Sequence, residues 1–188
     1  MQQLCWLPKK EETVRVSDLR PISLLNGSFK MVTKVLTNIL GPVLDDLIDP
    51  AQSGIIRGPN IHDSVATSHE VIFRSKIDGD EGFLLKLDFE KAYDSVLWDS
   101  VMEALKVKGF GQRWIDWIRT CMCTGKSRVL LNGHLGKEFR YCRGLRQGDP
   151  LSPLIFTLVA DILTTMIYHG REHGTCKERC LPLLLEVS

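Results

Sequence analysis

Neither sign of charge dominates this sequence, and it has no long uninterrupted apolar run. It holds 24 lysine and arginine residues against 23 aspartate and glutamate residues, a formal net charge of +1. Any affinity for nucleic acid would therefore need a local basic patch. A secretory leader needs an apolar core of about 7 to 15 residues and a membrane helix about 20, but the first apolar run covers only Leu4 to Leu7. We expect no secretory leader and no membrane contact.

The six cysteines lack the spacing of a disulfide framework, and the chain has no internal repeat. Free thiols in a chain of this size indicate a reducing compartment, so a nuclear or cytoplasmic location is expected. The 188 residues are about one domain long, and 44% hydrophobic with 25% charged residues is ordinary for a globular protein. This composition excludes a wholly disordered chain.

Apolar residues follow strand-like spacing in some segments and helical spacing in others. Strands are expected at 4–7, 20–26 and 83–89, and a hairpin at 129–141 whose connection of several residues contains Asn132-Gly133. Helices are expected at 29–47, after Asn60, and at 97–105, 114–122 and 154–166. The predicted fold class is α+β, with helices packed on a small, mostly antiparallel sheet.

Three residue types predict where two of the helices begin or bend. Ser28 is the expected cap of the first helix, and Gly41-Pro42 should kink it. Ser152 is the expected cap of the last helix, with Pro153 as its first residue.

Asp88 ends the apolar run 83–89, at the carboxyl end of a predicted strand. A carboxylate there can leave the core and bind a hard cation such as Mg²⁺. A template-directed polymerase uses two such ions, held by carboxylates from several strands. Taken alone the pattern is weak, because an aspartate after a strand is more often a helix cap or a turn residue.

Four motifs in order along residues 8–167 make the chain resemble the fingers and most of the palm of a non-LTR (LINE-type) retrotransposon reverse transcriptase. They are Arg20-Pro21-Ile22-Ser23-Leu24, Gln52-Ser53-Gly54, Lys86-Leu87-Asp88-Phe89-Glu90-Lys91-Ala92-Tyr93-Asp94 and Gly144-Leu145-Arg146-Gln147-Gly148-Asp149-Pro150-Leu151-Ser152-Pro153. The resemblance implies RNA-directed DNA polymerase ancestry, with an RNA template and a DNA primer as partners.

The resemblance also implies roles for individual residues. Asp88 matches a ligand of Mg²⁺, and the backbone carbonyl of Phe89 helps to hold the same ion. Tyr93 matches the steric gate under the incoming sugar. Gln147 and Gly148 match the loop that packs against the nascent base pair. Lys10 and Arg20 are the candidates for contacts with the triphosphate.

Each of these positions has a plain alternative. Tyr93 could be core packing, Arg20 a surface ion pair, and Gln147 a loop residue that satisfies neighbouring backbone.

The resemblance ends after Met166, where the family continues through a hairpin with paired aspartates and then a thumb. No aspartate follows Asp161 in this sequence. A two-metal site without those ligands should lose nearly all its rate, so we expect no enzymatic activity from the chain alone and no bound cofactor. Residues 1–170 are predicted to form the partial polymerase domain, and 171–188 an unrelated, disordered tail.

Three further patterns remain open. His169, His173, Cys176 and Cys180 have residue types that bind zinc, but their spacing is compact for a zinc site. The basic residues Lys137, Arg140, Arg143 and Arg146, with Tyr141 among them, could follow a phosphate backbone or form a solvated hairpin face.

The third pattern, Arg143-Gly144-Leu145-Arg146, is similar to the Arg-x-Leu-Arg (RxLR) tag of secreted oomycete effectors. That resemblance implies a protein that acts in the nucleus or cytoplasm of a host plant cell on a host protein, modulating defence or cell death. The four-residue pattern is short, and it lies far from the N-terminus without a leader.

Overall fold

The computed structural model describes residues 2–8, 19–48, 61–79, 91–131 and 133–173 of the chain. The predicted strand at 83–89 lies outside these ranges. In order along the chain, the described elements are β1 (Gln2–Pro8), β2 (Leu19–Leu24), α1 (Gly27–Leu47), α3 (Ile61–Asp78), α4 (Ala92–Ser95), α5 (Trp98–Val107), α6 (Gln112–Cys123), β3 (Lys126–Leu131), β4 (His134–Arg140) and α7 (Ser152–Glu172). The expected α+β class is confirmed.

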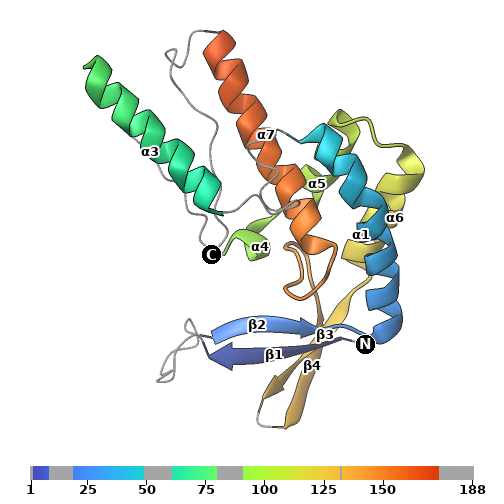
Figure 1. The fold of residues 1–188 in the computed structure, drawn as a ribbon. Coiled ribbons are helices and arrows are strands. Elements are labelled where there is room, and N and C mark those ends of the chain that lie inside the picture. Colours follow the sequence, from blue (N-terminus) through green and yellow to red (C-terminus); the bar gives the residue numbers. More distant parts are fainter. Residues whose placement is uncertain (1, 9–18, 49–60, 80–90, 132, 174–188) are drawn as a thin grey trace.

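The four described strands form one sheet in the order β2-β1-β3-β4. β1 pairs antiparallel with β2 and parallel with β3, and β3 pairs antiparallel with β4. The sheet lies at one end of the helices (Figure 1). As expected, it is small and mostly antiparallel.

The β3–β4 hairpin is tighter than the sequence predicted. Leu131 pairs with His134, so only residues 132 and 133 connect the strands, and Gly133 has φ 79°. An Asn-Gly pair favours two-residue hairpin turns because both positions need positive φ. The expected connection of several residues was wrong because the polar residues after the turn belong to β4.

The N-terminal cap of α1 is Asn26, not Ser28. The Asn26 side chain accepts a hydrogen bond from the Ser28 backbone N–H at 3.3 Å, and Ser28 is already helical. Asparagine and serine cap helices about equally well, and here the polar residue two positions earlier takes the role. The helix continues through Pro42.

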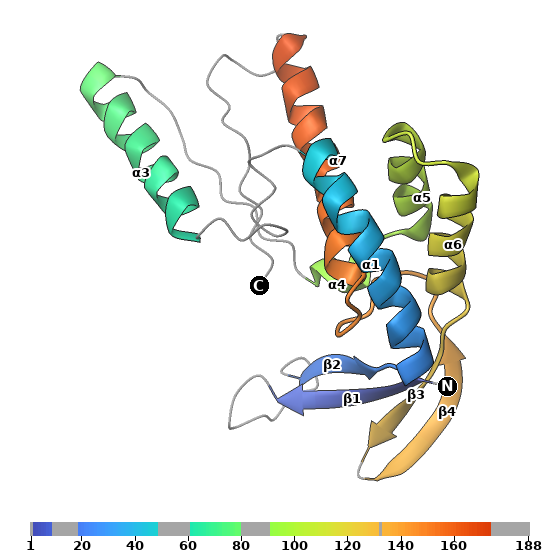
Figure 2. The same cartoon turned by 45° about the vertical axis from the view of Figure 1, so that its right-hand side comes forward.

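α7 is the central helix of the core. It packs against α5 and α1, while α3 stands apart from the other helices in both views (Figures 1 and 2). Seven apolar side chains from α1, α5, α6 and α7 are 0% exposed: Leu40, Leu44, Val101, Ala104, Leu105, Ile118 and Leu158. The helix begins at Ser152, one residue before the predicted start.

One ion pair joins three of these helices inside the core. Lys108, at the end of α5, donates hydrogen bonds to the Asp161 carboxylate on α7 and to the Leu47 carbonyl at the end of α1. The Asp161 side chain is only 3% exposed. The pair therefore fixes the ends of α1 and α5 against the middle of α7.

One of the described helices passes the length and composition test for a membrane span. Ser152–Gly170 is long and apolar enough to cross a membrane by length and composition alone, with 44% of the span buried inside the structure. Core helices of soluble proteins pass the same test, and here Ile155 and Leu158 pack in the core. The apolar length of α7 is explained by its central position.

Candidate functional site

The segment that connects β4 to α7 carries the second long sequence motif, and it is held at its start by α4. The Gly144 N–H donates to the Val96 carbonyl at 2.8 Å, and the Leu145 N–H donates to the Tyr93 carbonyl at 2.7 Å. Gly144 has φ 85°, and a Cβ there would lie 3.1 Å from the Asp94 carbonyl oxygen. Glycine is therefore required for this close approach.

Further along, the same loop docks on β2. The Ser23 N–H donates to the Gln147 carbonyl at 3.0 Å. Gly148 has φ 97°, and a Cβ there would meet the Ser23 carbonyl oxygen at 3.3 Å. Gln147 and Gly148 thus lie beside β2, the strand that contains Arg20.

Between these two attachments, Arg146 anchors the loop to the end of α6. The Arg146 side chain is buried, and its guanidinium donates to the Cys121 carbonyl at 2.7 Å and the Met122 carbonyl at 3.0 Å. These are carbonyls of the last helical turn, which lack partners within the helix. A Cβ at Gly125 would lie 1.8 Å from an Arg146 nitrogen, so glycine there makes room for the side chain.

Two rings also contact Arg146. Its guanidinium carbon lies 5.1 Å from the Phe29 ring centroid and 5.8 Å from that of Tyr141, within the range of cation–π attraction. Burial lowers the pKa of Arg146, although nearby Asp149 opposes the shift. A guanidinium remains charged in proteins, so Arg146 is a buried cation held by carbonyls and rings.

Asp149 lies just before α7 and is also buried. Its carboxylate accepts a hydrogen bond from the Leu151 N–H at 3.1 Å. Burial raises the pKa of Asp149, while the hydrogen bond from Leu151 lowers it. Sequence reasoning assigned no role to Asp149, although an aspartate three residues before Ser152 is the kind of acceptor that precedes a helix.

The Tyr93 ring is half-buried and stacks on Phe156 of α7, with ring centroids 5.3 Å apart. Burial raises the pKa of Tyr93. This contact is the core packing that the sequence left as an alternative to the steric gate. The backbone carbonyl of Tyr93 also holds the loop that presents Gln147.

Several predicted site residues cannot be placed. Asp88, Phe89 and Lys10 lie outside the described residues, as do Cys176 and Cys180. Arg20 lies in β2 and pairs with Leu7 of β1. Among the described residues, no group of three or more His, Cys, Asp or Glu side chains could hold a metal ion. His169 and His173 stack on each other in α7, with centroids 5.2 Å apart.

The predicted basic stretch is not one surface. Lys137 and Arg140 are exposed on β4, and Arg143 is exposed after it, but Arg146 points into the core contacts described above. The acidic residue Glu138 also lies between Lys137 and Arg140, and its carboxylate pairs with the Lys126 ammonium at 2.7 Å. In the Arg-x-Leu-Arg pattern, Leu145 and Arg146 are both buried.

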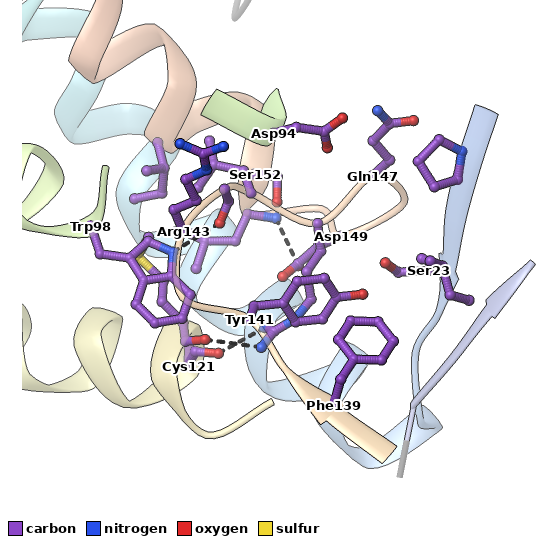
Figure 3. A pocket seen from close by; sticks show the side chains of 18 residues that line it. Ser23, Asp94, Trp98, Cys121, Phe139, Tyr141, Arg143, Gln147, Asp149 and Ser152 are labelled. Carbon is purple, nitrogen blue, oxygen red and sulfur yellow. Dashed lines mark hydrogen bonds between the residues drawn. The ribbon is translucent and has the colours of Figure 1, made fainter. Parts of the chain in front are cut away.

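Residues from β1, β2, β4 and the helices α4, α5, α6 and α7 meet around the loop, and Figure 3 shows them lining a pocket. In this view the Tyr141 ring lies between Trp98 on one side and Phe139 on the other, with Asp149 and Ser152 behind them. The Trp98 indole N–H donates to the Gly144 carbonyl at 2.8 Å. Sequence reasoning missed this pocket because its walls come from segments far apart along the chain.

Comparison with known proteins decides the family. Residues 7–176 match the family model described as reverse transcriptase (RNA-dependent DNA polymerase). The chain belongs to this family. Of the curated relatives, the Xenopus laevis transposon TX1 uncharacterized 149 kDa protein is 31% identical over 158 residues, which are 84% of this chain and 12% of that protein.

Two further relatives are Pol polyproteins of R2 elements. The Drosophila melanogaster type-2 retrotransposable element R2DM protein is 28% identical over 84% of this chain and 15% of its own length. The Nasonia vitripennis type-1 element R2 protein is 28% identical over 82% of this chain and 15% of its length. The resemblance to non-LTR retrotransposon polymerases is confirmed, and the chain spans only a small part of these relatives.

Proposed function

We propose that the chain forms the fingers and part of the palm of an RNA-directed DNA polymerase of a non-LTR retrotransposon, with an RNA template and a DNA primer as its partners. One observation supports this most strongly. The loop with Gln147 and Gly148 is hydrogen-bonded both to β2, at Ser23, and to α4, at Tyr93. Three of the four family motifs therefore meet in one place.

In this proposal the described residues position nucleic acid and nucleotide. The β2 hydrogen bond holds Gln147 where its side chain can pack against the nascent base pair, and the glycine at 148 allows the backbone to approach β2 closely. Tyr93 borders the site from the side of α4, where its ring would lie under the incoming sugar. Lys10 and Arg20 would contact the triphosphate.

In polymerases Mg²⁺ ions activate the primer hydroxyl and stabilise the leaving pyrophosphate. Asp88 and the Phe89 carbonyl would hold such an ion. No aspartate follows Asp161 in these 188 residues. We therefore propose that the chain alone does not polymerise.

The nucleic-acid part of the proposal can be tested without catalysis. A fluorescent RNA template annealed to a DNA primer should bind the chain, with an affinity that falls as salt rises because phosphate contacts release counterions. Arg20→Ala should leave this affinity near that of wild type and should weaken the binding of a deoxynucleoside triphosphate to the complex several-fold. Arg74→Ala is the matched control, because Arg74 pairs with Glu70 on the exposed surface of α3. Equal triphosphate affinities of the two variants would contradict the role of Arg20.

The catalytic part needs a primer-extension assay with Mg²⁺ and deoxynucleotides. We expect no extension above background, and the same result for Asp88→Asn. Extension by the wild-type chain that disappears in Asp88→Asn would show that the site is complete without further aspartates.

The effector alternative finds no support in the fold or the comparisons. A recognition tag must be accessible to its receptor, but Leu145 is 7% and Arg146 8% exposed. Both residues are occupied in holding the loop to α4 and α6. Within the described structure, the Arg-x-Leu-Arg pattern is explained by the polymerase loop.

A further inference from the structure

The hairpin of β3 and β4 concentrates positive charge. Its two strands hold four lysine and arginine residues and one glutamate, a balance of +3 in a chain whose formal net charge is only +1. The neighbouring strands β1 and β2 contain no acidic residue. A nearly neutral chain therefore carries, on this hairpin, the local basic patch that binding to a polyanion requires.

Three of these cations share one face of the hairpin. Lys126 is paired directly opposite Arg140, and Arg128, two residues along β3, is paired opposite Glu138. Directly opposite residues lie on the same face of a sheet, as do alternate residues along a strand. Ser127, between the two basic residues of β3, is 0% exposed and faces the other way. We call Lys126, Arg128 and Arg140 the hairpin cluster.

One carboxylate cannot neutralise three cations. The Lys126 ammonium lies 2.7 Å from one carboxylate oxygen of Glu138, and the Arg128 guanidinium lies 4.0 Å from the other. The hydrogen bond from Lys126 lowers the pKa of Glu138, and the charges of Arg128 and Arg140 lower it further. Like charges directly opposite each other, as at Lys126 and Arg140, destabilise a sheet. A bound anion would relieve this repulsion.

The hairpin cluster is accessible and suits a chain of phosphates. The side chains of Lys126 and Arg128 are 45% and 37% exposed, and Arg140 is exposed as well. Two residues along a strand span about 7 Å, which is similar to the distance between successive phosphates of an extended nucleic-acid strand. A guanidinium also matches the geometry of a phosphate group.

This surface differs from the one that carries the proposed nucleotide contacts. β1 separates β3 from β2, the strand of Arg20. Neighbouring strands lie about 4.8 Å apart, so the backbone of β3 is about 10 Å from that of β2, and β4 is farther away. Phe139, between Glu138 and Arg140, lines the pocket under the loop with Gln147. The hairpin cluster therefore lies on the face of β4 that is turned away from that pocket.

We propose that the hairpin cluster binds the phosphate backbone of single-stranded RNA. The inference rests on the proposed function for the choice of RNA as the polyanion, and it assigns the unpaired part of the template to a surface outside the nucleotide site. The cluster carries no aromatic ring that would read bases, so binding should depend on charge and not on base sequence.

Binding of fluorescent oligouridine to the 188-residue chain, without primer or nucleotide, tests the proposal across a range of salt concentrations. Lys126→Gln and Arg140→Gln should each weaken binding about fivefold at low salt, the value for one exposed charge contact. Each should also reduce the slope of log affinity against log salt by about 0.7. Arg74→Gln is the matched control, because it removes the same charge from the exposed surface of α3. Thermal melts show whether each variant is folded.

Glu138→Gln separates RNA binding from a purely structural role. It breaks the ion pair with Lys126, so it cannot act by strengthening that contact, but it removes the negative charge from the cluster face. We expect oligouridine to bind about fivefold more tightly. Glu70→Gln makes the same change in net charge on α3, where Glu70 pairs with Arg74, and should bind like wild type.

Three results would overturn the assignment. The first is a folded Glu138→Gln chain that binds oligouridine no more tightly than Glu70→Gln. The second is Lys126→Gln and Arg140→Gln binding as tightly as Arg74→Gln; RNA would then bind elsewhere, and the proposed function would stand. The third is displacement of oligouridine by polyglutamate of equal charge as efficiently as by unlabelled oligouridine, which would indicate an acidic protein partner. Absence of RNA binding by the wild-type chain would refute the RNA partner of the proposed function together with this inference.

Discussion

Replacing Lys108 by methionine should destabilise the chain by about 3 to 5 kcal/mol, the range measured when one partner of a buried ion pair is removed. Methionine keeps most of the apolar stem of lysine. The loss of unfolding free energy therefore measures the contribution of the ammonium group and not that of packing. Its removal leaves the Asp161 carboxylate, which is 3% exposed, without its lysine. It also leaves the Leu47 carbonyl without the Lys108 donor at 2.8 Å.

The partner substitution should cost less. Asp161→Asn keeps the size of the side chain and an oxygen that can accept from Lys108. The Lys108 side chain is 18% exposed and can turn its ammonium towards solvent. We expect a loss of about 1 to 3 kcal/mol, the value for a hydrogen bond to a charged group. The double variant Lys108→Met with Asp161→Leu buries no charge and should be more stable than Lys108→Met alone.

Urea unfolding followed by circular dichroism measures these differences, provided that the slope m is the same in all variants. Lys106→Met is the matched control on the same helix. Lys106 pairs with Glu103 at 3.3 Å, but both side chains are more than half exposed, so we expect a change of at most about 1 kcal/mol. The reasoning fails if Lys108→Met is no less stable than Lys106→Met, or if the double variant is as unstable as Lys108→Met.

Three further predictions concern the surface of α1, the loop and its buried carboxyl. Val35 and Ile39 are 57% and 49% exposed on one side of α1, so the chain should self-associate, and lysine at both positions should shift it towards monomer in sedimentation. Gly144→Ala should cost more than about 1 kcal/mol because of its positive φ, whereas Gly27→Ala, with open space around it, should melt like wild type. Because burial raises the pKa of Asp149, its folded pKa exceeds the unfolded one. Its stabilising contribution is therefore present at acidic pH and lost as pH rises through the folded pKa, so wild type should lose stability relative to Asp149→Asn over that interval in melts across pH.

Helical periodicity predicted the core helices well because it is a local signal. The apolar residues at 29–47 and 154–166 repeat every three to four positions, and their buried members, such as Leu40, Leu44 and Leu158, form the core. The family motifs did not predict that Gln147 and Gly148 lie beside β2, because that contact joins segments far apart along the chain. Ends of elements were less predictable, because Asn26 and Ser28 are equally good caps and only the packed helix shows which one is used.

The contacts of Arg146 could not be read from the sequence. Its spacing from Arg140 and Arg143 indicated a basic surface, since charged residues at regular intervals are usually solvated. Arg146 is buried because its guanidinium binds carbonyls 24 and 25 residues earlier, at the end of α6. The side chain occupies the space left by Gly125. These are long-range contacts that no local pattern encodes. The pocket was missed for the same reason.

Arg146 also explains how one loop can serve as a junction. Gly144 and Leu145 attach the loop to α4, Arg146 attaches it to α6, and Gln147 attaches it to β2. A lysine at 146 would be a single point charge, whereas the guanidinium reaches two carbonyls at once and stacks against rings. Because consecutive residues bind three different elements, a change at any one of them should shift its neighbours. The position of Gln147 beside β2 therefore depends on a buried cation whose guanidinium is hydrogen-bonded to α6.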